Sequence, residues 1–275
     1  MGSQFVNTTA FALVLSSASA YAQEPAGQPL WEVGALAFGV SQQAYPGASE
    51  QVNRALVVPT FIYRGKYLRA GEGGASIRAV KTPTFEFDVG FAGAFGSGNR
   101  DIPARRDMPK LGTLVEFGPR LKWNLGSLGN GSRLRTEFPV RGVFDVSNSF
   151  DPRGIAFEPE LQYDQRNATG WSYNASVGAL AGNRRLNETF YGVAPVYASA
   201  TRAAYAASSG LIALRLSAGV SRALSPDWRL FIFGRIDDVH AGANKDSPLV
   251  QRKTGASLGF GLAYTLKRSA NIAYD

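Results

Sequence analysis

The chain has 275 residues, a formal net charge of +8, a mean hydropathy of −0.11 and no cysteine. The length suits one large β domain, and the absence of cysteine excludes a disulfide framework and a thiolate metal site. A single histidine argues against a zinc site built from protein ligands alone, so we expect no metal and no cofactor.

The N-terminus has the pattern of a secretory signal peptide. A short apolar stretch over residues 11–15 precedes Ala20-Tyr21-Ala22, which is an A-x-A cleavage signature. This stretch is too short to cross a membrane as a helix, for which about 20 apolar residues are needed. The segment before it lacks the usual Lys and Arg. We predict a signal peptide over residues 1–22 and one mature domain over residues 23–275.

A two-residue alternation dominates the mature domain. Between Thr113 and Leu125, the odd-numbered positions include Phe117 and Leu121, and the even-numbered positions include Glu116 and Arg120. Alternate side chains share one face of a strand, so each such segment has one apolar face and one charged face. The segments run about 10–14 residues, the length that crosses a bilayer at a tilt. The sequence therefore predicts an all-β fold, a transmembrane antiparallel β-barrel.

We predict about twelve strands, separated by sequences rich in turn-forming residues. In chain order they cover residues 31–42, 54–64, 66–79, 84–95, 112–125, 132–145, 153–166, 169–182, 190–200, 209–223, 226–240 and 254–268. The longer connections are residues 43–53, 96–111 and 241–253.

The side of the membrane on which each connection lies presents a conflict. Long loops of bacterial barrels are extracellular, yet this count places residues 96–111 opposite the other two long connections. One solution is that residues 66–79, interrupted by Gly71-Glu72-Gly73-Gly74, form two strands. The other is that residues 96–111 enter the lumen or lie beneath it.

Two sets of residues are candidates for functional roles. Aromatic residues at strand ends predict girdles at the lipid–water interface: Trp31, Trp123, Trp171, Tyr191, Trp228 and Tyr264. Charged residues at the alternate positions that form the polar face of the strands predict a lumen-facing network. They are Glu86, Asp88, Glu116, Arg120, Lys122, Arg133, Arg135, Glu137, Arg141, Glu158, Glu160 and Asp164. Opposite charges on neighbouring strands are within reach of one another. The network either braces the wall or lines a conduit for small solutes, since twelve strands can be filled or open.

The sequence gives no pattern that requires catalysis, phosphate binding or nucleic-acid binding. His240 with Asp237, Asp238 and Ser247 would need to converge in space to form a triad, and a lone His at a loop mouth is usually a surface residue. The glycine-rich residues 96–101 precede no helix, so we do not expect a phosphate-binding loop. The basic charge comes without a nucleic-acid-binding motif, and it can instead meet lipopolysaccharide phosphates or anionic murein.

Several segments are similar to one family along nearly the whole mature chain. They are AYPGASEQVNRALVVPTFIYRG at 44–65, LVEFGPRLKW at 114–123, FYGV at 190–193, AYAASSGL at 204–211, LSPDWRL at 224–230 and DSPLV at 246–250. On these segments the chain resembles the MipA/OmpV family of outer-membrane proteins. It departs from the family after Leu266, where it continues for nine further residues instead of ending at the last strand.

The resemblance implies a non-enzymatic barrel in the bacterial outer membrane, in contact with membrane lipid and lipopolysaccharide. Family members are described as scaffolds that bring a lytic transglycosylase together with a murein synthase, and others as adhesins or envelope-stress proteins. No catalytic motif carries over. The alternative from another class is a narrow diffusion channel, which the charged lumen favours. The oligomeric state stays open.

Overall fold

The computed structural model describes residues 27–71, 74–93, 102–167 and 170–273. The predicted signal peptide over residues 1–22 and the glycine-rich residues 96–101 lie outside these ranges, so both stay predictions.

The described residues form strands and a few short helices. The strands are β1 (Trp31–Gln43), β2 (Gln51–Arg64), β3 (Leu68–Gly71), β4 (Gly74–Lys81), β5 (Phe85–Gly93), β6 (Leu114–Gly129), β7 (Ser132–Asp145), β8 (Asp151–Phe157), β9 (Glu160–Arg166), β10 (Trp171–Gly182), β11 (Gly210–Ala223), β12 (Trp228–Asp238) and β13 (Thr254–Arg268). The α-helix is α1 (Arg184–Tyr191), and short 3-10 helices cover Pro103–Arg105, Val146–Asn148 and Pro195–Tyr197. None of the helices among the described residues is long and apolar enough to cross a membrane.

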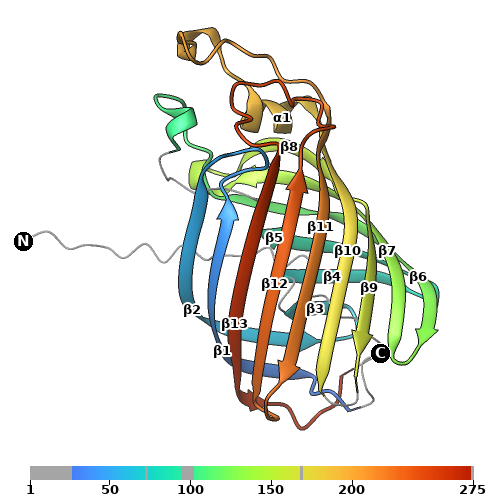
Figure 1. The fold of residues 1–275 in the computed structure, drawn as a ribbon. Coiled ribbons are helices and arrows are strands. Elements are labelled where there is room, and N and C mark those ends of the chain that lie inside the picture. Colours follow the sequence, from blue (N-terminus) through green and yellow to red (C-terminus); the bar gives the residue numbers. More distant parts are fainter. Residues whose placement is uncertain (1–26, 72–73, 94–101, 168–169, 274–275) are drawn as a thin grey trace, which may run out of the picture.

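These strands close into one antiparallel barrel (Figure 1). Strands that follow one another along the chain pair with each other, and β13 pairs with β1 to close the sheet. β8 and β9 occupy a single position because both lie between β7 and β10. The thirteen strand segments therefore fill twelve positions, which confirms the predicted all-β barrel of about twelve strands.

The predicted strand over residues 190–200 is wrong. Residues 184–191 form α1, whose first turn is capped by Asn183: its side-chain oxygen accepts a hydrogen bond from the Leu186 amide at 3.0 Å. Leu186 and Phe190 are four residues apart and both are buried on one helix face. Pro195 then begins a 3-10 helix, and proline is excluded from central strands. The alternation in this segment was fortuitous.

The predicted strand over residues 66–79 is two strands, β3 and β4, which pair with each other. This second error offsets the first, so the predicted number of strands is right although two of its members are not. The extra reversal also resolves the conflict over the long connections. Residues 102–113, the described part of the connection between β5 and β6, now lie at the same end of the barrel as residues 44–50 and 239–253.

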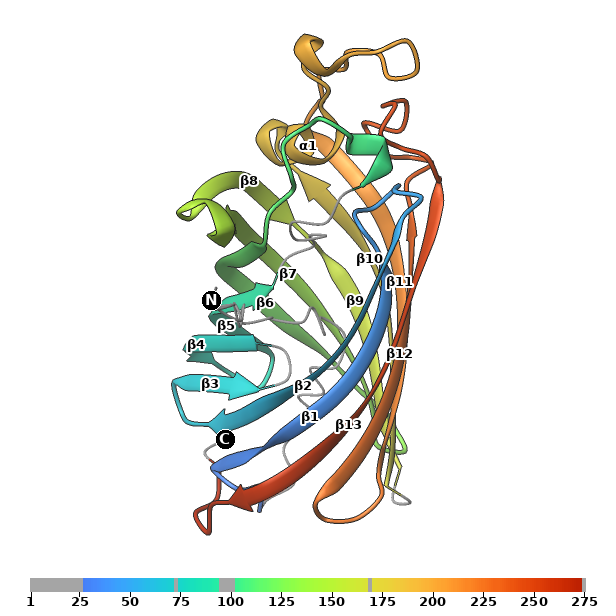
Figure 2. The same ribbon diagram turned by 90° about the vertical axis from the view of Figure 1, so that its left-hand side faces the viewer.

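The two ends of the barrel differ (Figures 1 and 2). The long connections gather with α1 at one end, and the short turns lie at the other. We call these the long-loop end and the short-turn end. The chain after Leu266 is held at the short-turn end, because the backbone amides of Ser269 and Ala273 donate hydrogen bonds to the carbonyls of Trp31 and Gln28. Bacterial barrels keep short turns in the periplasm, which places the long-loop end outside the cell.

The outer face of the wall is apolar. Phe117 and Trp123 on β6 are exposed, while the residues that precede them, Glu116 and Lys122, are buried. The rings of Phe91, Phe117 and Phe144 stack in a row across β5, β6 and β7, with centroids 5.7 and 5.2 Å apart. Such a face is stable against lipid and would be unfavourable in water.

Part of the lumen wall is also apolar, which the sequence pattern did not predict. Leu36, Phe38 and Val40 of β1 are buried together with Phe231 and Phe233 of β12. Between these strands runs β13, where the residues directly opposite Phe231 and Phe233 are glycines. The aromatic rings lie over them: a Cβ at Gly261 would be 2.3 Å from the Phe231 ring, and one at Gly259 would be 2.4 Å from Phe233. The glycines thus make room for neighbouring rings.

Gly261→Val is therefore expected to displace the Phe231 ring and destabilise the barrel, by about 1–3 kcal/mol as for other overpacked sites. The measurement is the temperature at which the folded form converts to the unfolded form on an unboiled gel. Ala256→Val is the control, because Ala256 is exposed on the same strand. Equal midpoints for the two variants would contradict the packing of Phe231 over Gly261.

Candidate functional site

A continuous chain of ion pairs crosses the lumen face of β4 to β9. Arg120 binds both oxygens of Asp88, at 3.0 and 2.8 Å, and also contacts Glu137 at 3.3 Å. Lys122 lies 2.8 Å from both Glu86 and Asp88. The side chain of Asp88 has no exposed surface. A buried carboxylate is stable only with such compensation.

The chain of pairs extends at both ends. Arg78 of β4 binds Glu86 at 2.8 Å. Arg135 of β7 contacts Glu137 at 3.7 Å and Asp164 of β9 at 3.2 Å, and donates to the side chain of Gln162 at 2.7 Å. Five strand positions are thus linked through side chains alone.

A second group of charges lies nearer the long-loop end. Arg141 of β7 contacts Glu116 at 3.1 Å and Glu158 at 3.6 Å. Glu158, which falls between β8 and β9, also binds Arg215 of β11. Arg215 in turn binds Asp237 of β12 at 2.7 Å, and Arg235 lies 3.2 Å from the same carboxylate. This group connects strands on different sides of the lumen.

The structure brings most of the predicted charged residues into these two groups. Glu160 accepts a hydrogen bond from Gln162, and Arg133 lies directly opposite Asp164 at the short-turn end. Sequence reasoning missed four members: Arg78, Arg215, Arg235 and Asp237. Arg215 lies on the polar face of a strand that was correctly predicted. The alternation of apolar and polar residues continues past residue 166, and following it there would have found Arg215.

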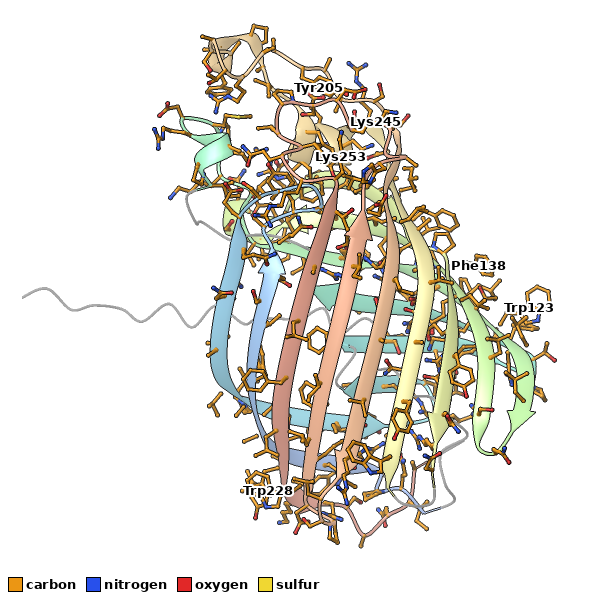
Figure 3. All side chains as sticks on the ribbon, in the orientation of Figure 1. Trp123, Phe138, Tyr205, Trp228, Lys245 and Lys253 are labelled. Atoms are coloured by element: carbon orange, nitrogen blue, oxygen red, sulfur yellow. The ribbon has the colours of Figure 1, made fainter. Side chains whose placement is uncertain are left out.

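Four of the predicted interfacial aromatics lie at the short-turn end. Trp31, Trp171 and Trp228 are the first residues of their strands, and the Tyr264 ring lies 4.5 Å from that of Trp228. Trp123 is higher on the wall, and with Phe138 it projects outward from the barrel (Figure 3). The girdle role of these five residues stays a prediction.

Tyr191 is not an interfacial aromatic, which corrects the sequence prediction. It ends α1, is 2 % exposed, and packs edge-on against Tyr45 with ring centroids 6.2 Å apart. Its hydroxyl donates to the carbonyl of Pro46 at 2.9 Å. The error follows from the wrong strand over residues 190–200, because the residue is on a helix inside the packed loops.

We call residues 44–50, 102–113, 183–209 and 239–253 the loop cap. Their buried apolar side chains form one core with lumen-facing residues near the long-loop ends of the strands. The members of this core are Ala44, Tyr45, Ala48, Val52, Ile102, Leu111, Leu114, Val143, Ala156, Leu180, Leu186, Phe190, Tyr191, Val193, Ala207, Ile212, Ala213, Val239 and Leu249. Because β2, β6, β7, β8, β10 and β11 all contribute, the core lies across the barrel end, where Figure 2 shows α1.

Hydrogen bonds join the four segments of the loop cap. The Tyr45 hydroxyl donates to Leu249 at 2.8 Å, and the Ser247 hydroxyl donates to Tyr191 at 2.7 Å. Arg105 donates to the carbonyl of Phe190 at 3.1 Å, and Arg202 donates to the carbonyl of Arg106 at 2.9 Å. Each of these bonds crosses from one long connection to another, so the loops form a folded unit.

Burial also sets the protonation of the loop cap. It raises the pKa of Tyr45 and of Tyr191, because a phenolate would lose its hydration there. Both phenols therefore stay protonated and act as donors. Burial lowers the pKa of Arg105, because burial disfavours the charged form and the charged form of arginine is the protonated one.

The sequence profile of one family, described as MltA-interacting protein MipA, matches residues 33–266. The chain belongs to the MipA family. The match extends from the first strand to the last, so it covers the whole barrel. No curated protein matches the chain in sequence.

Solved structures show the same architecture. An outer membrane channel from Pseudomonas putida matches with a TM-score of 0.52 at 9 % identity, over 89 % of this chain and 99 % of that one. The translocator domain of the autotransporter NalP from Neisseria meningitidis has a TM-score of 0.46 at 11 % identity, over 88 % and 90 % of the two chains. These likenesses concern the fold. The family match together with the closed sheet makes this MipA-family chain an outer-membrane β-barrel.

The residues considered for catalysis in this MipA-family barrel do not form a triad. The His240 ring lies 2.8 Å from Asp238 and is largely exposed. Ser247 is buried, and its hydroxyl is used in the bond to Tyr191. Within the described ranges, no three His, Cys, Asp or Glu side chains are placed to hold a metal ion.

Proposed function

We propose that this MipA-family barrel is a non-enzymatic docking scaffold for murein-remodelling enzymes at the outer membrane. The family description names an interaction with MltA, a lytic transglycosylase, and the resemblance adds a murein synthase as a second partner. The oppositely charged residues of the lumen brace the wall, so that the barrel presents fixed surfaces to its partners.

The loop cap is the observation that carries this proposal over a transport function. Its apolar core joins four long connections to the inner face of the strands. A packed apolar core excludes water, so the described residues of the loop cap obstruct a polar path for solutes at that end. Lumen charges below it serve as cross-links between strands.

The test combines two measurements on the purified barrel. We expect it to retain a lytic transglycosylase in a pull-down and to give no steady conductance steps in a planar bilayer. A barrel that conducts without retaining the enzyme would contradict the proposal.

A narrow diffusion channel is the second candidate, and the two charged groups in the lumen favour it. In a channel these side chains would select ions. Arg135→Glu would then change the ion selectivity of the conductance steps, because Arg135 contributes a buried cation to the lumen.

Opening the loop cap provides a sharper distinction. Tyr191→Ala removes a buried ring and its bond to Pro46, a change that costs about 3–5 kcal/mol in packed cores. We expect conductance to appear in this variant, because the cap loosens while the strands stay paired. Val196→Ala is the control, since Val196 is in the same connection but 80 % exposed. A folded Tyr191→Ala barrel that stays silent would show that the cap is not the seal.

A further inference from the structure

The net positive charge of the protein is concentrated at its two ends. We call the following described residues the basic rim, at the short-turn end: 27–32, 64–68, 81–85, 126–133, 166–167, 170–171, 222–229 and 266–273. Its nine basic residues are Arg64, Lys66, Lys81, Arg133, Arg166, Arg222, Arg229, Lys267 and Arg268, and its two acidic residues are Glu32 and Asp227. Nine minus two leaves a surplus of seven positive charges among the described rim residues.

Both acidic residues of the rim are paired with rim cations. Glu32 is already paired with Arg64 at 2.7 Å, and Asp227 with Arg268. The described residues between the rim and the loop cap carry ten basic and eleven acidic side chains, a difference of one. The rim is therefore electropositive with respect to the lumen, and its cations come from every short turn.

Several rim cations stand on the lumen side of the wall. Lys81 is directly opposite Glu86 and Arg133 is directly opposite Asp164, and directly opposed residues share a face. Arg229 is on the same parity as Phe231, which packs in the lumen. Lipid contacts only the outer face of a barrel. Lipid headgroups in the surrounding leaflet therefore meet few of these charges.

We propose that the basic rim binds murein through the free carboxylates of its peptide stems. The rim faces the periplasm, because the short turns lie there, and it includes the tryptophans at the strand starts, Trp31, Trp171 and Trp228. Murein is the extended polyanion on that side of the outer membrane, with carboxylates at repeated intervals. A ring of cations around a mouth attracts such a polymer without needing a shaped pocket. This binding is separate from enzyme docking.

The experiment is cosedimentation of the full barrel, in an uncharged detergent, with purified sacculi that carry no protein. We expect the bound fraction to fall at least about fivefold when NaCl rises from about 0.05 M to about 0.5 M, because salt screens exposed charges. The rim variant is Lys81→Glu, Arg229→Glu and Lys267→Glu together. The matched control is Arg184→Glu, Lys245→Glu and Arg252→Glu in the loop cap, which has the same change of charge at exposed positions.

We expect the rim variant to bind at least about fivefold less than wild type and the cap variant to stay within about twofold, since only the rim faces the sacculus. Sacculi whose carboxylates have been converted to amides should lose wild-type binding to the same degree, which tests the proposal even if the rim variant does not assemble. Equal binding by both variants, or unchanged binding to amidated sacculi, would overturn it. So would tighter binding to phosphatidylglycerol vesicles than to sacculi, which would identify lipid as the ligand. No enzyme is present, so failure here leaves the docking function untouched.

Discussion

Leu121→Arg is expected to prevent assembly of the barrel. Leu121 is on the outer face of β6, directly opposite Phe87 and Phe138 on the neighbouring strands. An arginine on the lipid face near the bilayer midplane costs about 2–4 kcal/mol, and the two phenylalanines opposite it carry no charge that could offset this cost. The measurement is the amount of heat-modifiable protein in the outer-membrane fraction, which should fall nearly to zero.

The neighbouring residue supplies the control. Arg120→Gln changes a side chain that faces the lumen, where Lys122 stays 2.8 Å from Asp88 and Arg135 stays 3.7 Å from Glu137. A folded barrel is therefore expected, with reduced stability. If both variants assemble equally, or if only Leu121→Arg does, the assignment of inner and outer faces is reversed, because a shift of one residue exchanges the faces of a strand.

Asp88→Ala is expected to have the largest effect among single changes in the lumen. The carboxylate is fully buried and neutralises Arg120 and Lys122 together. Its loss leaves two buried cations sharing only Glu86 and Glu137 of these carboxylates, and removing one partner of a buried pair costs about 3–5 kcal/mol. Unfolding by denaturant in lipid vesicles measures this as a lower midpoint.

A second substitution tests the cause. Asp88→Ala with Arg120→Met also removes the guanidinium that Asp88 bound through both oxygens, while Lys122 keeps Glu86 at 2.8 Å, so most of the lost stability should return. Asp227→Ala is the control for a surface pair, because its side chain is half exposed and such pairs contribute about 0–1 kcal/mol. If the double variant is no more stable than Asp88→Ala, loss of packing and not buried charge explains the effect.

The sequence by itself determined the class of fold and the inside and outside of the wall. Strand parity is a local property, since side chains at alternate positions share a face whatever the rest of the chain does. Glu116 and Phe117 were therefore assigned to opposite faces, and the structure buries the first and exposes the second. The family could be predicted as well, because its segments recur in order along the chain.

Only the tertiary structure decided which charges pair, where the chain reverses and what closes the barrel. Arg215 and Glu158 are far apart in sequence and meet because β11 and β8 both pair with β10, on its two sides. The stretch from Phe190 to Val193 alternates like a strand, but its apolar side chains are buried by Tyr45 and Leu249 from other connections. Contacts of this kind depend on register and closure. Local periodicity does not contain them, because burial against distant segments outweighs local preference.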